Sequence, residues 1–563
     1  MTSSYPIPRR EFLKTSLLGI AATGLGVSSL DAQERARPAV ASAPGRPIPR
    51  LVKQDGKFRL MVDGKPFLML GGQVGNFYAY PDMVERAWSG FKAMNLNTVE
   101  YPVYWNVIEP EEGRFDFSGF DRILAGLRSQ GLRAILLWFG TWKNGAMDWT
   151  PNWVKANPQR FPRVMDSGGH PIRSLSPMSK VTLEADRKAF VTLMQHLREV
   201  DEADRTVIMV QVENEPGSLG SARDFSPESN RLFAGPAPAP LVASLKKQPG
   251  SWKEVFGRIA DEAFNAYYLS GYINEVARAG KEAYPLPAYV NVWNGGYDSN
   301  DNFEKFDRPG ETYPSGGAVA HMLDLWKANA PAIDAIASDD YHQDPIIFLK
   351  VLDSYKRPDN PLLIVENGGP IAARGVFYAI ANYAAIGYGY MGGDWAVETQ
   401  GPDMAPVGAD FRLLQGALPV ILELQGTEKL KAAIEERGTG ARNLIFSNYD
   451  VLARFHPPGR QAVAAVNAGP FLATSAEPSS RVLVAELGPD EFLILGFGSS
   501  VEFRPVQGSD YTAAQLVSNE QGVYEDGVWK TTAQGQTAQG DYTGPIVNLP
   551  ANGALVKVKL MKY

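Results

Sequence analysis

The feature that most constrains this chain is a short buried segment that ends abruptly in acids. Residues 207–212 are apolar and mostly β-branched apart from one glutamine, and they run directly into Glu213, Asn214, Glu215 and Pro216. An apolar run of this kind is typical of a strand buried on both faces. Because carboxylates cannot lie unpaired in a dry interior, the carboxyl end of this strand must open into a polar place. In parallel α/β folds that end is where active sites are built.

A second segment later in the chain repeats the pattern. Residues 361–365 are an apolar run that leads into Glu366, Asn367 and two glycines. Two glutamates at the ends of two such strands suggest a paired-carboxylate site, in which one acid donates a proton and the other acts as nucleophile or base. A solvated loop acid remains the alternative for either glutamate taken alone.

Between and around these segments, apolar runs alternate with helical patterns. We expect strands near residues 71–76, 97–101, 133–138, 207–212, 288–293, 333–341, 361–365 and 387–395. The expected helices include 83–94, 120–129, 183–200, 252–279 and 374–385. This period predicts an α/β fold, a (β/α)8 TIM barrel over residues 51–425 that carries Glu215 at its fourth strand and Glu366 at its seventh.

Two further regions have a β pattern. Asp63-Gly64 separates two apolar runs, which is a hairpin signal. Beyond about residue 440, short apolar runs recur between Gly, Pro and Asp residues, so we expect an antiparallel β-sandwich domain over residues 426–563. That domain carries no chemical motif, and its expected role is to pack against the barrel.

The start of the chain has the pattern of a targeting segment. Arg9-Arg10 and the following Glu-Phe-Leu-Lys precede an apolar run that is too short and too weakly apolar to span a bilayer. We interpret residues 1–32 as a twin-arginine-type signal peptide and residues 33–50 as a linker. The expectation is a periplasmic or secreted protein with no stable membrane insertion after cleavage.

Composition excludes several classes of function. A net charge of −7 without a basic cluster disfavours nucleic-acid binding, because a phosphate backbone demands a basic footprint. There is no cysteine, and the five histidines are scattered, so we expect no metal site. No phosphate loop and no Gly-x-Ser-x-Gly elbow occur. We therefore expect carboxylate chemistry that needs no cofactor.

Three blocks of sequence resemble glycoside hydrolase family 35, the β-galactosidases with a clan A barrel. They are residues 98–117, 137–145 and 211–215. With the trailing β-domain, the chain is most similar to a bacterial branch that includes enzymes acting on the galactose side chains of plant xyloglucan. One departure is Pro216, where many family members carry Tyr-Gly. It bears on sugar specificity rather than on the chemistry.

The resemblance implies roles for individual residues. It makes Glu215 the general acid/base and Glu366 the nucleophile, with Asn214 beside them to bond the sugar 2-hydroxyl. Tyr341 would hold Glu366, and Trp395 would form the platform for the sugar, although a strand cap and a core residue are the respective alternatives. Further substrate-binding candidates are Tyr104, Asn106, Trp142 and Asn144.

The resulting hypothesis is a retaining exo-β-galactosidase whose partner is a carbohydrate. Its substrates would be terminal β-galactosyl residues of oligosaccharides or of plant cell-wall glycans such as xyloglucan. Another clan A β-glycosidase, an endo-glycanase and a non-catalytic sugar-binding barrel remain alternatives. Two long loops, residues 139–182 and 216–250, should wall the barrel mouth, and a closed pocket or an open cleft there would separate exo from endo action.

Overall fold

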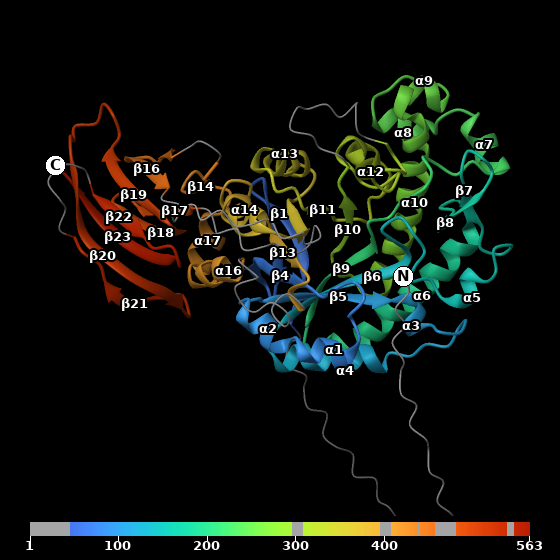
Figure 1. The fold of residues 1–563 in the computed structure, drawn as a ribbon, viewed down its shortest axis with the longest axis horizontal. Helices are drawn as coiled ribbons and strands as arrows, with labels where there is room; N and C mark the ends of the chain where they lie inside the picture. Colours follow the sequence, from blue (N-terminus) through green and yellow to red (C-terminus); the bar gives the residue numbers. More distant parts are fainter. Residues whose placement is uncertain (1–45, 296–307, 395–406, 437–439, 456–479, 538–544) are drawn as a thin grey trace, which may run out of the picture. The chain divides into compact units, whose positions relative to one another are not determined.

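The computed structural model describes residues 46–295, 308–394, 407–436, 440–455, 480–537 and 545–563 (Figure 1). The predicted signal segment 1–32, most of the predicted linker and Trp395 lie outside these residues. None of the helices in the described ranges combines the length and the apolar character needed to cross a bilayer.

Eight strands of the described chain close into a barrel, and each pairs in parallel with its neighbours. The last strand, β13, returns to the first, β4, with Gly387 opposite Met69. In barrel order the strands are β4 (Met69–Gln73), β5 (Thr98–Tyr104), β6 (Arg133–Lys143), β9 (Val207–Asn214), β10 (Ala288–Trp293), β11 (Ala335–Asp340), β12 (Leu363–Asn367) and β13 (Gly387–Met391). The predicted TIM barrel is confirmed, with β9 as its fourth strand and β12 as its seventh.

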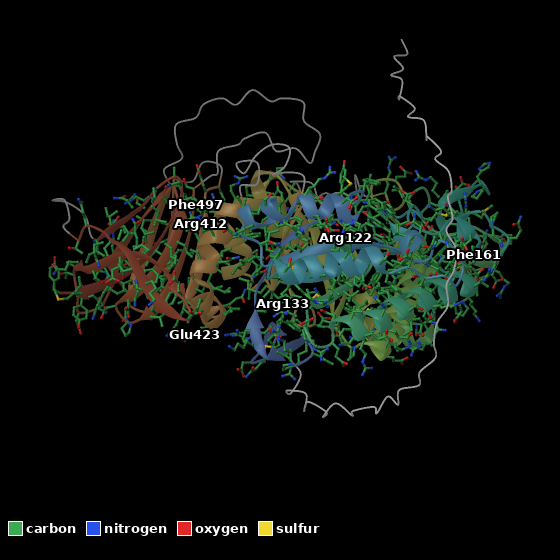
Figure 2. All side chains as sticks on the ribbon, turned by 90° about the horizontal axis from the view of Figure 1, so that it is seen from below. Arg122, Arg133, Phe161, Arg412, Glu423 and Phe497 are labelled. Atoms are coloured by element: carbon green, nitrogen blue, oxygen red, sulfur yellow. The ribbon has the colours of Figure 1, made fainter. Side chains whose placement is uncertain are left out.

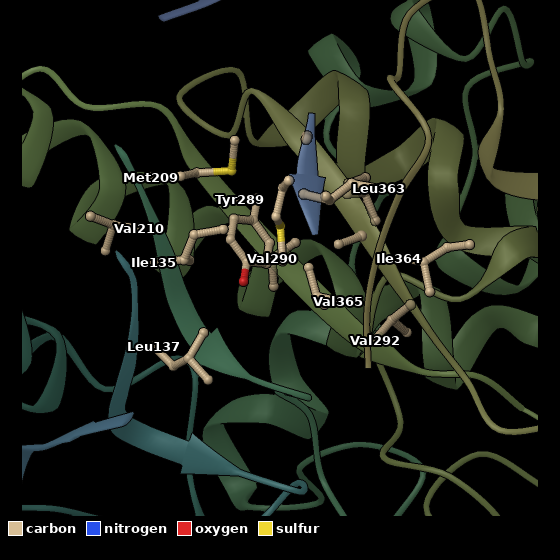
Figure 3. Packing of buried hydrophobic residues seen from close by; sticks show 14 of the residues in the cluster. Ile135, Leu137, Met209, Val210, Tyr289, Val290, Val292, Leu363, Ile364 and Val365 are labelled. Atoms are coloured by element: carbon tan, nitrogen blue, oxygen red, sulfur yellow. The ribbon is translucent and has the colours of Figure 1, made fainter. Parts of the chain in front are cut away.

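Apolar side chains pack the barrel strands together. Figure 3 shows side chains from β6, β9, β10 and β12 gathered in one cluster, among them Ile135, Met209, Val290 and Val365. All four are buried, as the continuous apolar runs in these strands require. The packed interior leaves the strand ends as the place for polar chemistry.

Helices surround the barrel and connect its strands. They are α1 (Pro81–Arg86), α2 (Trp88–Ala93), α3 (Trp105–Ile108), α4 (Ser118–Ser129), α5 (Asn152–Lys155), α6 (Lys180–Asp201), α7 (Pro227–Phe233), α8 (Ala239–Ser244), α9 (Trp252–Phe256), α10 (Ala260–Ala283), α12 (Leu323–Asn329), α13 (Pro345–Tyr355) and α14 (Pro370–Ala381), with 3-10 turns η1 (Gly257–Ile259) and η2 (Ala320–Met322). The prediction of one continuous helix over residues 252–279 is wrong. Gly257 adopts a φ of 58°, which ends α9 before α10 begins.

The N-terminal strands form a small antiparallel sheet, β1 (Arg50–Gln54), β2 (Lys57–Val62) and β3 (Lys65–Phe67). In the turn between β2 and β3, Asp63 has a φ of 51° and Gly64 a φ of 77°. Two consecutive positive φ values define the tight hairpin turn that Asp-Gly favours. The predicted hairpin is confirmed.

The C-terminal region contains two antiparallel sheets. One has the order β14 (Leu430–Ile434), β17 (Arg481–Gly488), β18 (Glu491–Phe497), β23 (Ala554–Lys562), β20 (Ala514–Glu525), β21 (Val528–Gln534), and the other has the order β15 (Ala441–Ile445), β16 (Tyr449–Phe455), β19 (Ser499–Pro505), β22 (Ile546–Leu549). A separate two-stranded sheet, β7 (Arg163–Met165) with β8 (Pro171–Leu175), lies in the loop after β6. Antiparallel sheets after the barrel agree with the predicted fold class.

Alternate residues of the larger sheet belong to two different cores. In β17, Leu483 and Ala485 join the cluster that includes the barrel, whereas Val482 and Val484 join the cluster between the two sheets. Successive side chains of a strand point to opposite faces, so β17 is buried on both sides. The helices α16 (Val407–Gly416) and α17 (Leu418–Leu424) precede it, and Figure 2 shows Phe497 at the boundary between them and the sandwich.

Candidate active site

The two glutamates singled out in the sequence lie at the same end of the barrel. Glu215 directly follows β9, and Glu366 lies in β12. Their exposed fractions are 5% and 3%. Carboxylate oxygens of Glu215, Glu366 and Asp339 of β11 all lie within 4.8 Å of one another. The structure therefore brings the two predicted acids together with a third.

Hydrogen-bond donors surround Glu366. Its Oε1 accepts from the side-chain amides of Gln73 at 3.0 Å, Asn214 at 3.2 Å and Asn291 at 3.4 Å. Its Oε2 accepts from the Tyr341 hydroxyl at 3.0 Å. Burial and then the neighbouring carboxylates raise the pKa of Tyr341 well above its usual range, so the hydroxyl keeps the proton that it donates. Four donors on two oxygens suit an ionised carboxylate, which only accepts.

Glu215 has contrasting surroundings. Burial raises the pKa of its carboxyl to about 7, with the charge of Glu366 adding to the rise and nearby Lys143 opposing it. Its Oε2 accepts a hydrogen bond from the side-chain amide of Asn144. A carboxyl that titrates near neutrality is able to give a proton and take one back. Two carboxylates whose environments differ in this way are suited to different roles.

The backbone that presents Glu215 is strained and held from several sides. Glu213 has a φ of 64° and Glu215 a φ of 42°, a region that costs non-glycine residues on the order of 1–3 kcal/mol each. The Glu215 N–H donates to Asn291 Oδ1 at 2.8 Å, and its carbonyl accepts from the Gly145 N–H at 3.0 Å. The Glu213 carboxylate accepts from the Trp142 N–H at 2.7 Å. These bonds fix the direction in which Glu215 points.

Asp339 is a site residue to which the sequence interpretation assigned no role. Its Oδ2 accepts from the Asn291 side-chain amide at 2.7 Å. Burial, followed by the charges of Glu366 and Glu215, raises the pKa of its carboxyl well above the usual range. A signal was present, because Asp339 ends the sixth apolar strand run as Glu215 and Glu366 end the fourth and seventh.

Glu100 of β5 is a second buried acid that the sequence interpretation did not single out. Both of its oxygens are buried without a hydrogen-bond partner among the described residues. Burial and then the charge of Glu366 raise its pKa well above the usual range. A Cβ atom on Gly389 would approach Glu100 Oε1 to 2.1 Å, and one on Gly71 would approach it to 2.8 Å. These two glycines make room for a carboxyl inside the barrel.

The structure brings three of the predicted binding residues to the glutamates. Asn214 and Tyr341 donate to Glu366, and Asn144 donates to Glu215. Asn106 of α3 donates its backbone N–H to the Trp149 carbonyl at 3.0 Å, and its Oδ1 is buried without a partner in the described part of the chain. Trp395 lies outside the described residues.

Two other predictions need correction. Trp142 is 1% exposed, and its indole N–H donates to Ser174 Oγ at 3.0 Å, so its ring belongs to the core rather than to a pocket. Tyr104 is buried, and its hydroxyl donates to the Asn76 carbonyl at 2.8 Å and accepts from the Ala79 N–H at 3.1 Å. Because that hydroxyl is occupied by the loop after β4, Tyr104 supports the wall of the site.

One group of three acids in the described ranges has the spacing to share a metal ion, and it is the cluster of Glu215, Asp339 and Glu366. One oxygen each of Glu215 and Asp339 and both oxygens of Glu366 already accept from N–H or O–H donors. Donors of this kind occupy the lone pairs that a cation would need. The arrangement favours shared protons, and the absence of a metal stays a prediction.

Comparisons with known proteins match part of this barrel to a family model. Residues 59–255 match the family model described as "Glycosyl hydrolases family 35", and residues 407–543 match a "Domain of unknown function (DUF5597)". The first match contains Glu215 and ends before Glu366. The resemblance to glycoside hydrolase family 35 is confirmed over these four barrel strands.

Individual relatives agree with the family match. A protein named "Beta-galactosidase" from Xanthomonas manihotis is 30% identical over 183 residues, which are 30% of this chain and 27% of that protein. "Beta-galactosidase-1-like protein 3" from Homo sapiens is 30% identical over 178 residues, 31% of this chain and 25% of that protein. The aligned part thus spans about a quarter of the length of these relatives.

Solved structures of two β-galactosidases align with lower identity. The enzyme from the psychrophilic Marinomonas ef1 has a TM-score of 0.44 at 14% identity and covers 62% of this chain and 60% of its own. The enzyme from Rahnella sp. R3 has a TM-score of 0.42 at 19% identity and covers 66% and 58%.

Proposed function

We propose that this chain is a retaining exo-β-galactosidase that removes terminal β-galactosyl residues from oligosaccharides or plant cell-wall glycans such as xyloglucan. The observation that carries the proposal is the approach of Glu215 and Glu366 oxygens to within 4.8 Å. Retaining glycosidases hold their two carboxyl groups about 5–5.5 Å apart, whereas inverting enzymes leave about 6.5–9.5 Å for a water molecule.

The first chemical step forms a bond between Glu366 and the sugar. A carboxylate oxygen of Glu366 attacks the anomeric carbon, the glycosidic carbon–oxygen bond breaks, and the Glu215 proton passes to the leaving oxygen. The product is a galactosyl ester on Glu366, which no longer carries charge. Without that charge, the carboxyl of Glu215 ionises more readily.

The second step reverses the roles. Glu215 takes a proton from water, the water oxygen attacks the anomeric carbon, and the ester bond to Glu366 breaks. Both steps invert the anomeric carbon, so the net configuration is retained. Asn214 and Tyr341 hold the nucleophile through their hydrogen bonds to its two oxygens. We also expect Asn214 to bond the sugar 2-hydroxyl, as proposed from the sequence.

The test is hydrolysis of a panel of aryl glycosides by the purified protein, with NMR of the first-formed sugar. We expect the β-galactoside to exceed the β-glucoside, β-xyloside and β-mannoside, because a site that bonds the axial hydroxyl rejects epimers that leave its polar groups unpaired. The first-formed sugar should be the β-anomer. A preference for glucoside contradicts the specificity, and an α-anomer contradicts the mechanism.

Metal removal tests whether the proposed activity depends on a cation. Because donors already face one oxygen each of Glu215 and Asp339 and both oxygens of Glu366, we expect EDTA to leave activity unchanged. Activity that EDTA abolishes and an added divalent metal restores would show that the acid cluster binds a cation.

A further inference from the structure

Phe77 is the most exposed large apolar side chain in the described part of the chain, with 67% of its surface accessible. It lies in the loop after β4, directly behind Asn76. A ring left in water in this way gains from any apolar surface that covers it. Single exposed apolar residues are common, so the position of Phe77 matters more than its exposure.

The loop that carries Phe77 starts beside the proposed nucleophile, Glu366. Gln73 ends β4 and donates one side-chain amide to both Glu366 Oε1, at 3.0 Å, and Asn76 Oδ1, at 3.3 Å. The neighbouring residue of Asn76 therefore stands at the barrel mouth rather than on a distant face.

The ring of Phe77 meets Trp149, which comes from the loop after β6. The two ring centroids are 5.8 Å apart. The same loop begins with Asn144, which donates to the proposed acid Glu215. The two loops that contact the two glutamates thus touch each other through Phe77 and Trp149.

This aromatic pair rests on a fixed base. Trp149 stacks on Tyr104 with centroids 3.8 Å apart and planes within 8°. The Tyr104 hydroxyl binds the backbone on both sides of Phe77, at Asn76 and at Ala79. Both loops are therefore tied to one buried ring, and little backbone freedom remains to be lost when a ligand covers Phe77.

Two polar atoms near this base have no hydrogen-bond partner among the described residues, namely Trp149 Nε1 and Asn106 Oδ1. One is a donor and the other an acceptor, and buried groups of this kind normally have a partner. Because both atoms are buried, an enclosed water molecule beneath the platform would be their partner rather than a sugar hydroxyl.

We propose that Phe77 and Trp149 form a stacking platform for the sugar ring attached to the leaving oxygen. The proposal rests on the proposed function, because the proton of Glu215 must reach that oxygen and the leaving group must therefore lie beside Glu215. The loop that contacts Glu215 is also the one that carries Trp149. The preferred substrates are then galactosides in which galactose is joined to a second pyranose ring.

The test compares two substrates that differ only in the leaving group. In β-galactosyl fluoride the leaving group has no ring, whereas in a β-galactosyl disaccharide it is a pyranose. Phe77→Ala should reduce the ratio of kcat/KM for the disaccharide to kcat/KM for the fluoride by roughly tenfold to a hundredfold, the equivalent of one lost apolar ring contact. An unchanged ratio overturns the platform.

Two control variants separate stacking from general damage. Phe77→Tyr retains a flat ring and should restore the ratio. Tyr511→Ala removes another exposed ring, 46% accessible and in the C-terminal region, and should leave the ratio as in the wild type. A Tyr511→Ala ratio that falls as far as that of Phe77→Ala also overturns the platform.

A binding measurement keeps the platform testable apart from catalysis. In a Glu366→Gln background, calorimetry with the intact disaccharide should show roughly tenfold or more weaker binding when Phe77 is also changed to Ala. Equal affinities overturn the platform. Failure of the wild type to hydrolyse galactosyl fluoride would instead overturn the proposed function, and the calorimetric difference would still decide on the platform.

Discussion

The barrel mouth and the base of the C-terminal sheet both bury charged side chains, but they do so in opposite ways. At the mouth, Glu215, Glu366 and Asp339 put three carboxyl groups together. At the base of the C-terminal sheet, the Arg481 guanidinium of β17 donates to both oxygens of Asp410 in α16, at 2.6 and 2.7 Å. Both side chains are 0% exposed. The centroid of the Phe497 ring lies 3.9 Å from that guanidinium.

The ion pair and the carboxyl cluster serve different purposes, one structural and the other chemical. A bidentate pair satisfies both partners, so it serves the structure as long as neither is removed. At the mouth cluster, burial instead raises the pKa of Glu215 to about 7, with the charge of Glu366 adding to the rise, and this keeps a proton available. Such a cluster costs stability and persists because the surrounding hydrogen bonds hold it.

The largest effect should come from removing one carboxylate of the cluster. Glu366→Ala should lose on the order of a thousandfold or more of activity on every substrate, because no nucleophile remains. Glu215→Ala should be much less impaired on aryl galactosides with good leaving groups, which scarcely need protonation. Steady-state kinetics on activated and unactivated substrates measures both.

Azide distinguishes the two roles in these variants. It should rescue Glu215→Ala by attacking the galactosyl-enzyme, with β-galactosyl azide as product. In Glu366→Ala it takes the place of the nucleophile and should yield the α-azide. The opposite pair of products would exchange the assigned roles.

The next largest effect should be structural and leave the chemistry alone. Arg481→Met strands a buried carboxylate at Asp410 and should lower the free energy of unfolding by about 3–5 kcal/mol. The Arg481→Met/Asp410→Leu double variant should recover most of that loss, because it removes both charges at once. Denaturant unfolding measures the stabilities, and kcat per folded molecule should match the wild type in both variants.

At the barrel mouth, by contrast, removal of a charged side chain should raise the free energy of unfolding. The pKa of Glu215 rises from an ordinary 4.5 to about 7, so its contribution to stability is fully present below 4.5 and is lost as the pH rises through 7. Glu215→Gln cannot ionise and escapes this loss. We expect it to exceed the wild type in unfolding free energy at pH 8 by on the order of 1–3 kcal/mol, with a smaller gain at pH 5. A destabilised Glu215→Gln at pH 8 would contradict the cost assigned to the cluster.

Much of the fold could be predicted because it depends on local pattern. Mostly apolar runs mark the barrel strands, and Asp63-Gly64 marks a hairpin. The helix over residues 252–279 was predicted as one element because a single glycine in a long apolar pattern does not reveal a positive φ. The alternation in β17 between two cores likewise depends on what packs against each face.

The site was predictable in part for a similar reason. Glu215 and Glu366 end strands, and strand ends meet at one edge of a barrel. Trp142 was misplaced because a tryptophan in a mouth loop is equally able to point into the core, where Ser174 accepts its indole N–H. Glu100 stands inside a strand, where only the neighbouring glycines Gly71 and Gly389 make room for it.

The smallest effect concerns which acid of the cluster holds the extra proton. Because Glu215 has a pKa of about 7, kcat/KM on a poor leaving group should fall roughly tenfold per pH unit above 7. The ionisable groups that face Glu215 are Lys143, Glu366 and Asp339, and Tyr341 also lies near. Burial and two neighbouring charges keep the carboxyl of Asp339 protonated, so it donates to Glu215 and lowers the pKa of that acid.

The direction in which substitution of Asp339 moves the alkaline limb of the pH profile therefore shows whether Asp339 is protonated. Asp339→Ala removes the donor, so the alkaline limb of the pH profile should move to higher pH. Asp339→Asn keeps an N–H donor and should move the limb by less than about half a unit. If Asp339 were ionised, both variants would remove a negative charge beside Glu215, lower its pKa and move the limb to lower pH. Profiles of kcat/KM between pH 5 and 9, measured on one unactivated galactoside, separate the two outcomes. The direction in which the alkaline limb moves distinguishes them, whatever the fall in activity.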